Sequence, residues 1–346
     1  MAPTTYKQWT LEGQDGFESL VCGEAELPTH LGDNEVLVKL HAASLNYRDL
    51  AVAKGAKGLV TNHNVVPGSD GAGVIISTGK LVSSFKSGDK VVTHMLPNFP
   101  SEAFPTMLEI GAGLGHAIDG TFREFGVFDQ GALVHMPKNL SFEEAATLTC
   151  SGLTAWNALF GGGKALGKGD SVLTQGTGGV SVAALQFAHA AGATVISTTS
   201  SDAKVDRLIG LGATRTINYR TNPNWGEEAK SLTQDKLGII NVIDVGGLST
   251  LSESLKAVKV QGVVSLTGVL GDGEPPSIMD VLWRVCSVRG VILGSKRQFD
   301  DMVRFVEEHD IRPVVDERVF GFGEVREAFR WVDEQKHFSK VVIKLV

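Results

Sequence analysis

The chain has 346 residues, which suits two domains of ordinary size, and its 42% hydrophobic and 21% charged residues are typical of a globular protein with a sizeable core. The formal net charge is −7 and no basic block occurs, which excludes the charge pattern of a nucleic-acid-binding protein. No apolar run reaches the roughly 18 residues of a membrane span, so no membrane partner is expected. Three widely spaced cysteines and a start without a signal-peptide pattern predict a cytoplasmic protein.

The first 125 residues predict a β-rich module. Residues 35–40 alternate apolar and polar side chains, as a half-buried strand does. Residues 97–120 are rich in Gly and Pro and lack periodicity, which predicts a loop. Further strands are expected at 74–76, 121–127 and 132–136.

From Ser141 the pattern changes to alternating helices and strands. Ser141 with Glu144 three residues later is a capping signature that starts a helix, and residues 153–160 predict a second helix. Beyond residue 200, helices are expected at 203–211, 248–257, 298–309 and 323–334, and strands at 239–244, 262–267, 288–293 and 340–346. This order predicts an α/β module between two parts of a discontinuous first domain.

Residues 171–201 predict a strand–turn–helix–strand unit, which implies a parallel sheet. The strand Val172–Thr174 is followed by a glycine turn, by a helix over 180–191 and by a second strand over 193–197. The glycines allow backbone N–H groups to approach a pyrophosphate at the helix N-terminus. We therefore expect a dinucleotide at the turn and the helix start, formed by Gly176, Thr177, Gly178, Gly179 and Val180. The alternative is a glycine-rich turn without a ligand.

The end of the second strand favours NADP(H) over NAD(H). Proteins that bind NAD usually have an acidic residue at this position, which holds the ribose 2′-hydroxyl. This chain instead has Thr199, Ser200 and Ser201, followed by Lys204. Hydroxyl groups with an ammonium suit a 2′-phosphate, which a carboxylate would repel. Tyr219 is a candidate for contact with the adenosine end. Each of these residues has the alternative of a solvated loop position.

Short motifs along nearly the whole chain resemble those of the medium-chain dehydrogenase/reductase superfamily. They lie, in family order and spacing, at residues 66–74, 88–91, 145–146, 152–156, 176–180, 211–213 and 294–295. The resemblance implies a GroES-like catalytic domain over 1–151 and 295–346, and a Rossmann domain with a doubly wound parallel sheet over 152–294. It also implies an active site in the cleft between the domains and a homodimer or homotetramer.

Within this superfamily the chain looks like the zinc-independent quinone oxidoreductase and enoyl reductase branch. Where zinc-dependent relatives hold the catalytic metal with Cys, His and Cys, this chain has Asn46, Ser69 and Cys150. An amide, a hydroxyl and one thiol are a poor zinc set, so no metal is expected. A site formed by Cys150, Asp70 and water remains the alternative.

Further cofactor contacts follow from the resemblance alone. Thr154 would face the nicotinamide, Lys340 would reach the pyrophosphate, and Arg297 is a weaker candidate for the phosphates. The carboxamide would be held by Gly268, Val269, Leu293, Gly294 and Ser295.

The missing metal favours reduction of an activated C=C bond in an enone, enoyl or quinone substrate. Hydride addition to such a bond leaves a delocalised enolate that a few hydrogen bonds can stabilise, whereas an alkoxide needs a stronger electrophile. Tyr47 is the first candidate for the proton donor, with a packing role as its alternative, and Asn46 would position a substrate oxygen or a water, or cap the turn. The other functions left open are a zinc-independent alcohol or carbonyl dehydrogenase and a non-catalytic NADPH-binding protein.

Overall fold

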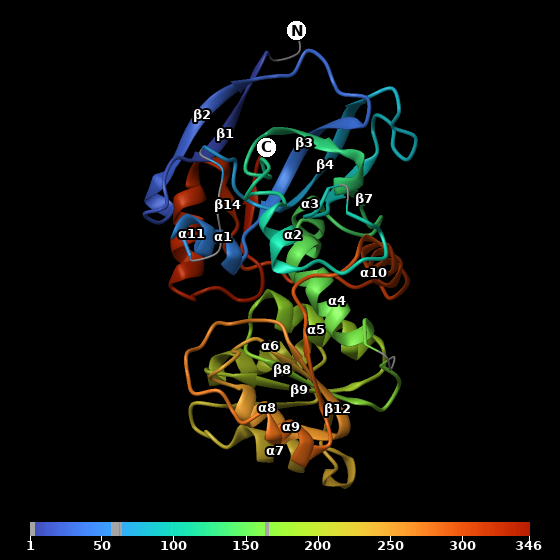
Figure 1. Ribbon diagram of the computed structural model, residues 1–346, viewed down its shortest axis with the longest axis vertical. Coiled ribbons are helices and arrows are strands. Elements are labelled where there is room, and N and C mark those ends of the chain that lie inside the picture. Colours follow the sequence, from blue (N-terminus) through green and yellow to red (C-terminus); the bar gives the residue numbers. More distant parts are fainter. Residues whose placement is uncertain (1–3, 57–61, 63, 98, 163–165) are drawn as a thin grey trace. The chain divides into compact units, whose positions relative to one another are not determined.

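The computed structural model describes residues 4–56, 62, 64–97, 99–162 and 166–346. The chain forms two compact units (Figure 1). The first unit consists of Met1–Leu153 with Ser295–Val346, and the second unit consists of Thr154–Gly294. No helix in the described ranges is long and apolar enough to cross a membrane.

The first unit is built on a seven-stranded sheet in the order β14-β15-β3-β4-β5-β7, with β6 also paired to β3. Its strands are β3 (Glu35–Ser44), β4 (Asp70–Thr78), β5 (Lys90–Thr93), β6 (Phe125–Asp129), β7 (Leu133–His135), β14 (Phe320–Gly321) and β15 (Val342–Lys344). A separate hairpin joins β1 (Thr5–Leu11) to β2 (Leu20–Glu26). The helices are α1 (Tyr47–Ala53), α2 (Met107–Gly111), α3 (Phe142–Ala145), α10 (Lys296–Glu308) and α11 (Val325–Asp333).

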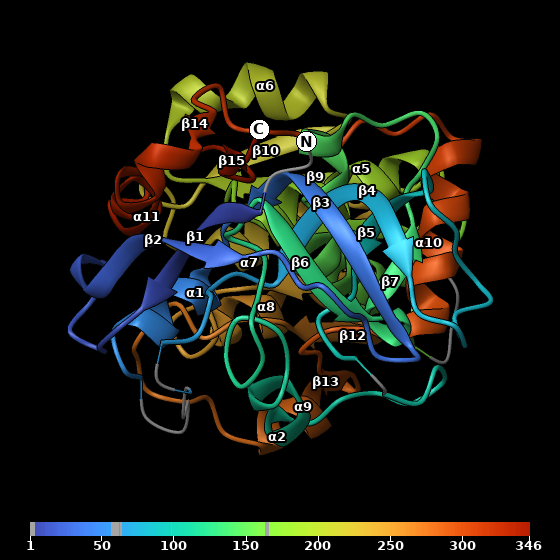
Figure 2. The same ribbon diagram turned by 90° about the horizontal axis from the view of Figure 1, so that it is seen from above.

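The register of three strands brings polar residues to one end of this sheet. Ser44 ends β3 and lies opposite Asp70, the first residue of β4, and Figure 2 shows these two strands side by side. On the other side of β3, Val342 of β15 also lies opposite Ser44. Lys340, two residues before Val342, is therefore placed beside the chain that leaves β3.

The second unit is a six-stranded parallel sheet in the order β10-β9-β8-β11-β12-β13. Its strands are β8 (Ser171–Gln175), β9 (Thr194–Thr199), β10 (Arg215–Asn218), β11 (Ile239–Asp244), β12 (Val258–Leu266) and β13 (Ser287–Gly290). The helices are α4 (Leu153–Phe160), α5 (Gly179–Ala190), α6 (Val205–Gly210), α7 (Trp225–Ser231), α8 (Leu251–Ala257) and α9 (Met279–Arg284). In Figure 1, α5 and α6 lie on one side of the strands and α7, α8 and α9 on the other. This arrangement confirms the predicted Rossmann fold with a doubly wound sheet.

Predictions of local structure are confirmed where they rest on a short motif with a clear hydrogen-bonding reason. The capping signature at Ser141 is confirmed, because its backbone N–H donates to Glu144 Oε2 at 2.8 Å and its Oγ accepts from the Glu144 N–H at 3.2 Å. The prediction that residues 97–120 form only a loop is wrong, since α2 lies within them. Helix α1 was not predicted from the sequence, although Asn46 and Asp49 stand at N-cap and N3 positions that favour a helix start.

Candidate active site

The predicted dinucleotide turn joins the end of β8 to the start of α5. Gly176 has a φ of 72°, a left-handed conformation that favours glycine, and its N–H donates to the Thr198 carbonyl at 2.9 Å. A Cβ added at Gly176 or Gly178 would meet nothing within 4 Å. The backbone therefore faces open space at the N-terminus of a 12-residue helix, where unpaired N–H groups and the helix dipole favour an anion.

The residues proposed to select the cofactor gather at the carboxyl ends of β8, β9 and β10. Lys204 Nζ donates to Thr177 Oγ1 at 3.0 Å, which places an ammonium on the glycine turn. The Tyr219 N–H donates to the Thr199 carbonyl at 3.0 Å, and the hydroxyl of Thr199 accepts from the Ser201 N–H at 3.2 Å. The structure thus brings the turn and the ends of these strands together, as the Rossmann fold requires of a phosphate site.

The residues matched to the nicotinamide end lie after β12 and β13, apart from Thr154, which lies in α4. The Thr154 hydroxyl donates to the Ile292 carbonyl at 3.2 Å, and Asn157 Nδ2 donates to the Leu293 carbonyl. A Cβ at Gly268 would lie 2.3 Å from the Val245 carbonyl oxygen, so only glycine fits there. Among the other matched residues, Val269 is exposed, Ser295 caps α10, and Gly294 ends the second unit.

The first unit contains a buried ammonium at the end of its sheet. Lys340 is 4% exposed, and its Nζ lies 2.5 Å from Asn46 Oδ1, 2.8 Å from the Leu45 carbonyl oxygen and 3.4 Å from Asp70 Oδ2. The lysine matched to a pyrophosphate contact therefore directs its charge into the core of its own unit, toward three oxygen atoms. We call Lys340, Asn46 and Asp70 the buried polar cluster, and the half-buried Cys150 lies beside it.

Asp70 is the anion of this cluster and is fully buried. Its Oδ1 accepts from Ser69 Oγ at 2.7 Å. Its Oδ2 accepts from Ser44 Oγ and from the Cys150 N–H, both at 3.3 Å, in addition to the Lys340 ammonium. A buried carboxylate with this many donors is well compensated.

Two buried donors at the start of α1 have no hydrogen-bond partner among the described residues. They are Asn46 Nδ2 and Arg48 Nη2, although the other terminal nitrogen of Arg48 bonds the Leu114 carbonyl at 3.1 Å. Asn46 is 7% exposed, and its Oδ1 also accepts from Ser151 Oγ at 3.3 Å. Unpartnered buried donors are rare and costly, so each favours an oxygen partner, from a water or from a ligand.

The titratable groups beside the cluster are shifted toward their neutral forms. Burial raises the pKa of Asp49 to about 6, against the opposing charge of Arg48. Burial, and then the charge of Asp70, raises the pKa of the Cys150 thiol to about 12. The Cys150 sulfur is therefore a neutral thiol at physiological pH.

This donor set does not fit a zinc ion. Of the residues matched to metal ligands, Asn46 already directs its oxygen at an ammonium, Ser69 directs its hydroxyl at Asp70, and Cys150 holds its proton. Zinc prefers thiolate, imidazole or carboxylate ligands, and a nearby ammonium would repel it. No cluster of three or more His, Cys, Asp or Glu side chains able to hold a metal occurs within the described ranges.

The remaining predicted residues lie on the surface or in ion pairs. Tyr47 is the first residue of α1 and is 55% exposed. Arg297 forms an exposed ion pair with Glu102 at 2.9 Å. Ser44 and Ser151 also belong to the site, and neither was predicted from the sequence. The sequence feature that could have indicated these two serines is their position, because each lies within two residues of a position matched to a metal ligand.

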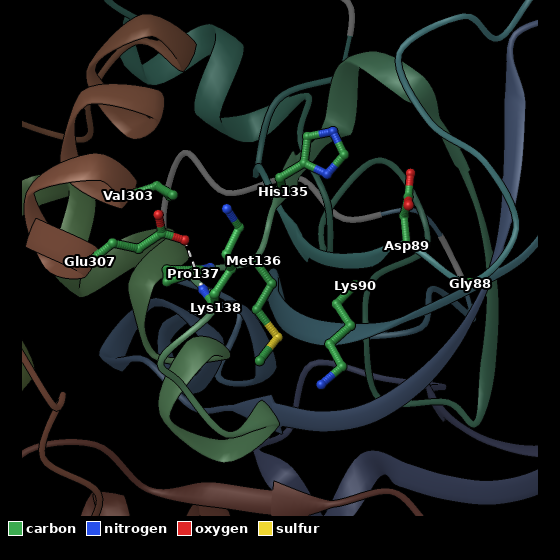
Figure 3. A pocket seen from close by; sticks show the side chains of 9 residues that line it. All are labelled: Gly88, Asp89, Lys90, His135, Met136, Pro137, Lys138, Val303 and Glu307. Carbon is green, nitrogen blue, oxygen red and sulfur yellow. Dashed lines mark hydrogen bonds between the residues drawn. The ribbon is translucent and has the colours of Figure 1, made fainter. Parts of the chain in front are cut away.

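A pocket of about 560 Å³ in the first unit lies apart from these residues. Figure 3 shows Lys90, Lys138 and His135 around it with Asp89 and Glu307, and the Lys138 N–H donates to Glu307 Oε1 at 2.8 Å. None of the residues predicted for the site lines this pocket.

Comparison with known proteins gives two matching family models and relatives that align over most of this chain. Residues 32–138 match the alcohol dehydrogenase GroES-like domain, and residues 179–308 match a model described as zinc-binding dehydrogenase. A zinc-type alcohol dehydrogenase-like protein of Schizosaccharomyces pombe is 45% identical over 95% of this chain and 96% of its own length. The 2-methylene-furan-3-one reductase of Solanum lycopersicum is 28% identical over 99% of this chain and 79% of its own. A solved structure of a putative alcohol dehydrogenase from Sinorhizobium meliloti has a TM-score of 0.90 at 36% identity, covering 99% of this chain and 100% of that chain.

Proposed function

The chain belongs to the medium-chain dehydrogenase/reductase superfamily of nicotinamide-dependent oxidoreductases, and we propose that it reduces an activated C=C bond with NADPH and without a metal. The substrate class is a small enone, enoyl or quinone compound. The observation that carries the proposal is the buried polar cluster, in which an ammonium contacts Asn46, one of the residues matched to metal ligands, and the carboxylate of Asp70.

The cluster supports this chemistry because it offers hydrogen bonds and lacks a strong electrophile. When bound, the nicotinamide supplies the hydride, which would add to the β-carbon of the substrate. The charge that develops on the substrate oxygen is delocalised as an enolate, and preorganised donors stabilise such a charge well. The name of the Solanum lycopersicum relative, 2-methylene-furan-3-one reductase, is consistent with an enone substrate.

The preference for NADPH is supported by Lys204 on the glycine turn. Its contact with Thr177 holds a cation close to the end of β9, where no carboxylate precedes Asp202. The carboxylate of Asp202 accepts a hydrogen bond from Asn218 Nδ2, on β10, at 2.7 Å. The 2′-phosphate of NADPH would pair with this ammonium, whereas the 2′-hydroxyl of NADH carries no charge to pair with it.

A second candidate is a carbonyl or alcohol dehydrogenase, favoured by the names of the yeast relative and the Sinorhizobium structure. The test measures NADPH consumption with enones, quinones, enoyl thioesters and simple aldehydes, repeated with NADH and with a chelator, beside zinc analysis of the protein. We expect chelator-insensitive reduction of enones or quinones and zinc far below one ion per chain. Chelator-sensitive turnover of aldehydes or alcohols with bound zinc would refute the proposal, and tight NADPH binding without any turnover would favour a non-catalytic role.

We also propose that the protein is a homo-oligomer joined through the second unit. β13 is an edge strand of the parallel sheet, and apolar side chains beside it are exposed, including Ile278, Leu282, Trp283 and Val285. Edge strands and apolar patches are the usual places where a second copy pairs. Sedimentation should show a dimer or tetramer that Trp283→Glu weakens, whereas Leu108→Glu, at an exposed apolar residue of the first unit, should leave it intact.

A further inference from the structure

The amide of Asn46 has only one orientation that fits its neighbours. The Lys340 ammonium donates hydrogen bonds and cannot accept them, so the atom 2.5 Å from it must be the amide oxygen. Ser151 Oγ, 3.3 Å from the same oxygen, is satisfied as a donor in this orientation. The Nδ2 group then points away from Lys340, buried and without a partner among the described residues.

Lys340 itself is held so firmly that it fixes this orientation. Its three oxygen contacts come from Leu45, Asn46 and Asp70, which belong to two adjacent strand ends. These contacts use the three donors of an ammonium. An amide that accepts from a cation is also polarised, which makes its own N–H groups stronger donors.

We propose that Lys340 is a positioning residue, which turns and polarises the Asn46 amide so that Nδ2 donates to the developing enolate oxygen of the substrate. The inference rests on the proposed function and deepens it, because it assigns the oxyanion donor. It also reassigns Lys340, whose family match is a pyrophosphate contact. Asn46 is then the catalytic residue that touches substrate, and Lys340 acts through it.

The decisive variant is Asn46→Asp, because a carboxylate keeps the contact with Lys340 but offers no N–H. Loss of one oxyanion donor typically lowers kcat about 100-fold or more. We expect that loss with an NADPH dissociation constant changed by less than about twofold. Asn34→Asp is the matched control, since this exposed amide also accepts through its oxygen, at 3.0 Å from Gln130, and the substitution adds the same charge to the same unit.

The role of Lys340 is tested in the double variant Lys340→Met with Asp70→Asn, which removes both buried charges together. If Lys340 orients Asn46, kcat should fall about tenfold with little change in KM, because the amide becomes free to rotate. The NADPH dissociation constant, measured by fluorescence titration, should stay within about twofold. A rise of tenfold or more in that constant would overturn the inference and assign Lys340 to the cofactor phosphates.

A binding measurement separates this inference from the proposed function. The phenolate of para-nitrophenol carries a delocalised oxygen charge like that of an enolate, and its binding to the NADP-loaded protein can be followed by its absorbance. We expect the wild type to bind it and Asn46→Asp to bind it at least about tenfold more weakly. Equal binding by both proteins, or no binding by the wild type, would overturn the Asn46 assignment. If phenolate binding behaves as expected and no C=C substrate is reduced, the proposed function fails and the donor assignment stands.

Discussion

The two units present their candidate ligand-binding groups in different ways. The second unit offers backbone N–H groups at the N-terminus of α5, and the space beyond Gly176 and Gly178 is open. The first unit offers side chains from distant segments, and it buries a full ion pair to hold them. Backbone donors are free of desolvated charge, whereas a buried charge couples the site to the stability of the fold. Substitutions at the site of the second unit should therefore change ligand affinity with little effect on stability. Substitutions at the site of the first unit should change both function and stability.

The substitution Lys340→Met, which has the largest expected effect, tests the link between function and folding in the first unit. The substitution leaves the fully buried Asp70 without its cation, and we expect the free energy of unfolding to fall by about 3–5 kcal/mol. The measurement is urea denaturation followed by fluorescence, with NADPH absent. Adding Asp70→Asn should restore most of the loss, because it removes the uncompensated charge.

The matched control is the surface ion pair between Lys54 and Asp333 in the same unit, with both side chains more than a third exposed. Lys54→Met should cost less than about 1 kcal/mol. Equal losses in Lys54→Met and Lys340→Met would show that the buried cluster contributes nothing special to stability.

The next effect concerns Asp49, whose folded pKa of about 6 lies above its ordinary value. A raised folded pKa means that the native state binds the proton more tightly than the unfolded chain does. The stabilisation is therefore present below about pH 4 and is lost as the pH rises through about 6, a change of about 3 kcal/mol. Asp49→Asn does not titrate, so its unfolding free energy relative to wild type should rise across this window. A pH-independent difference between the two proteins would contradict the shift.

The same contrast explains what could be predicted from the sequence. The glycine turn and its strands were predictable because the signal is local and Gly176 takes a left-handed conformation that favours glycine. The buried polar cluster with Cys150 beside it was not, because Asn46, Asp70, Cys150 and Lys340 meet only through strand register and a turn of π-helix at Leu148–Gly152. The resemblance singled out Asn46, Cys150 and Lys340, yet no sequence pattern indicates that the lysine points into its own unit.

In the second unit, Gly178→Ala should separate binding from folding. An added Cβ would meet nothing within 4 Å, and the φ of −79° suits alanine, so the folding cost should be at most about 1 kcal/mol from the weaker helix cap. The methyl group would enter the space proposed for the pyrophosphate, and we expect NADPH to bind at least about tenfold more weakly. Gly210→Ala, also in open space, is the control. Unchanged NADPH affinity in Gly178→Ala would place the dinucleotide elsewhere.

The smallest expected effect, and the finest test of the open second-unit site, is the choice between NADPH and NADH. Lys204→Ala removes a partly exposed ammonium that donates to the Thr177 hydroxyl on the glycine turn. If that ammonium pairs with a 2′-phosphate, NADPH affinity should fall about tenfold while NADH affinity changes by less than about twofold. The measurement is paired fluorescence titration with both cofactors at two salt concentrations, because an exposed ion pair weakens as salt rises. Equal losses for both cofactors would assign Lys204 to the shared pyrophosphate, and the preference for NADPH would then need another origin at Ser200 or Ser201.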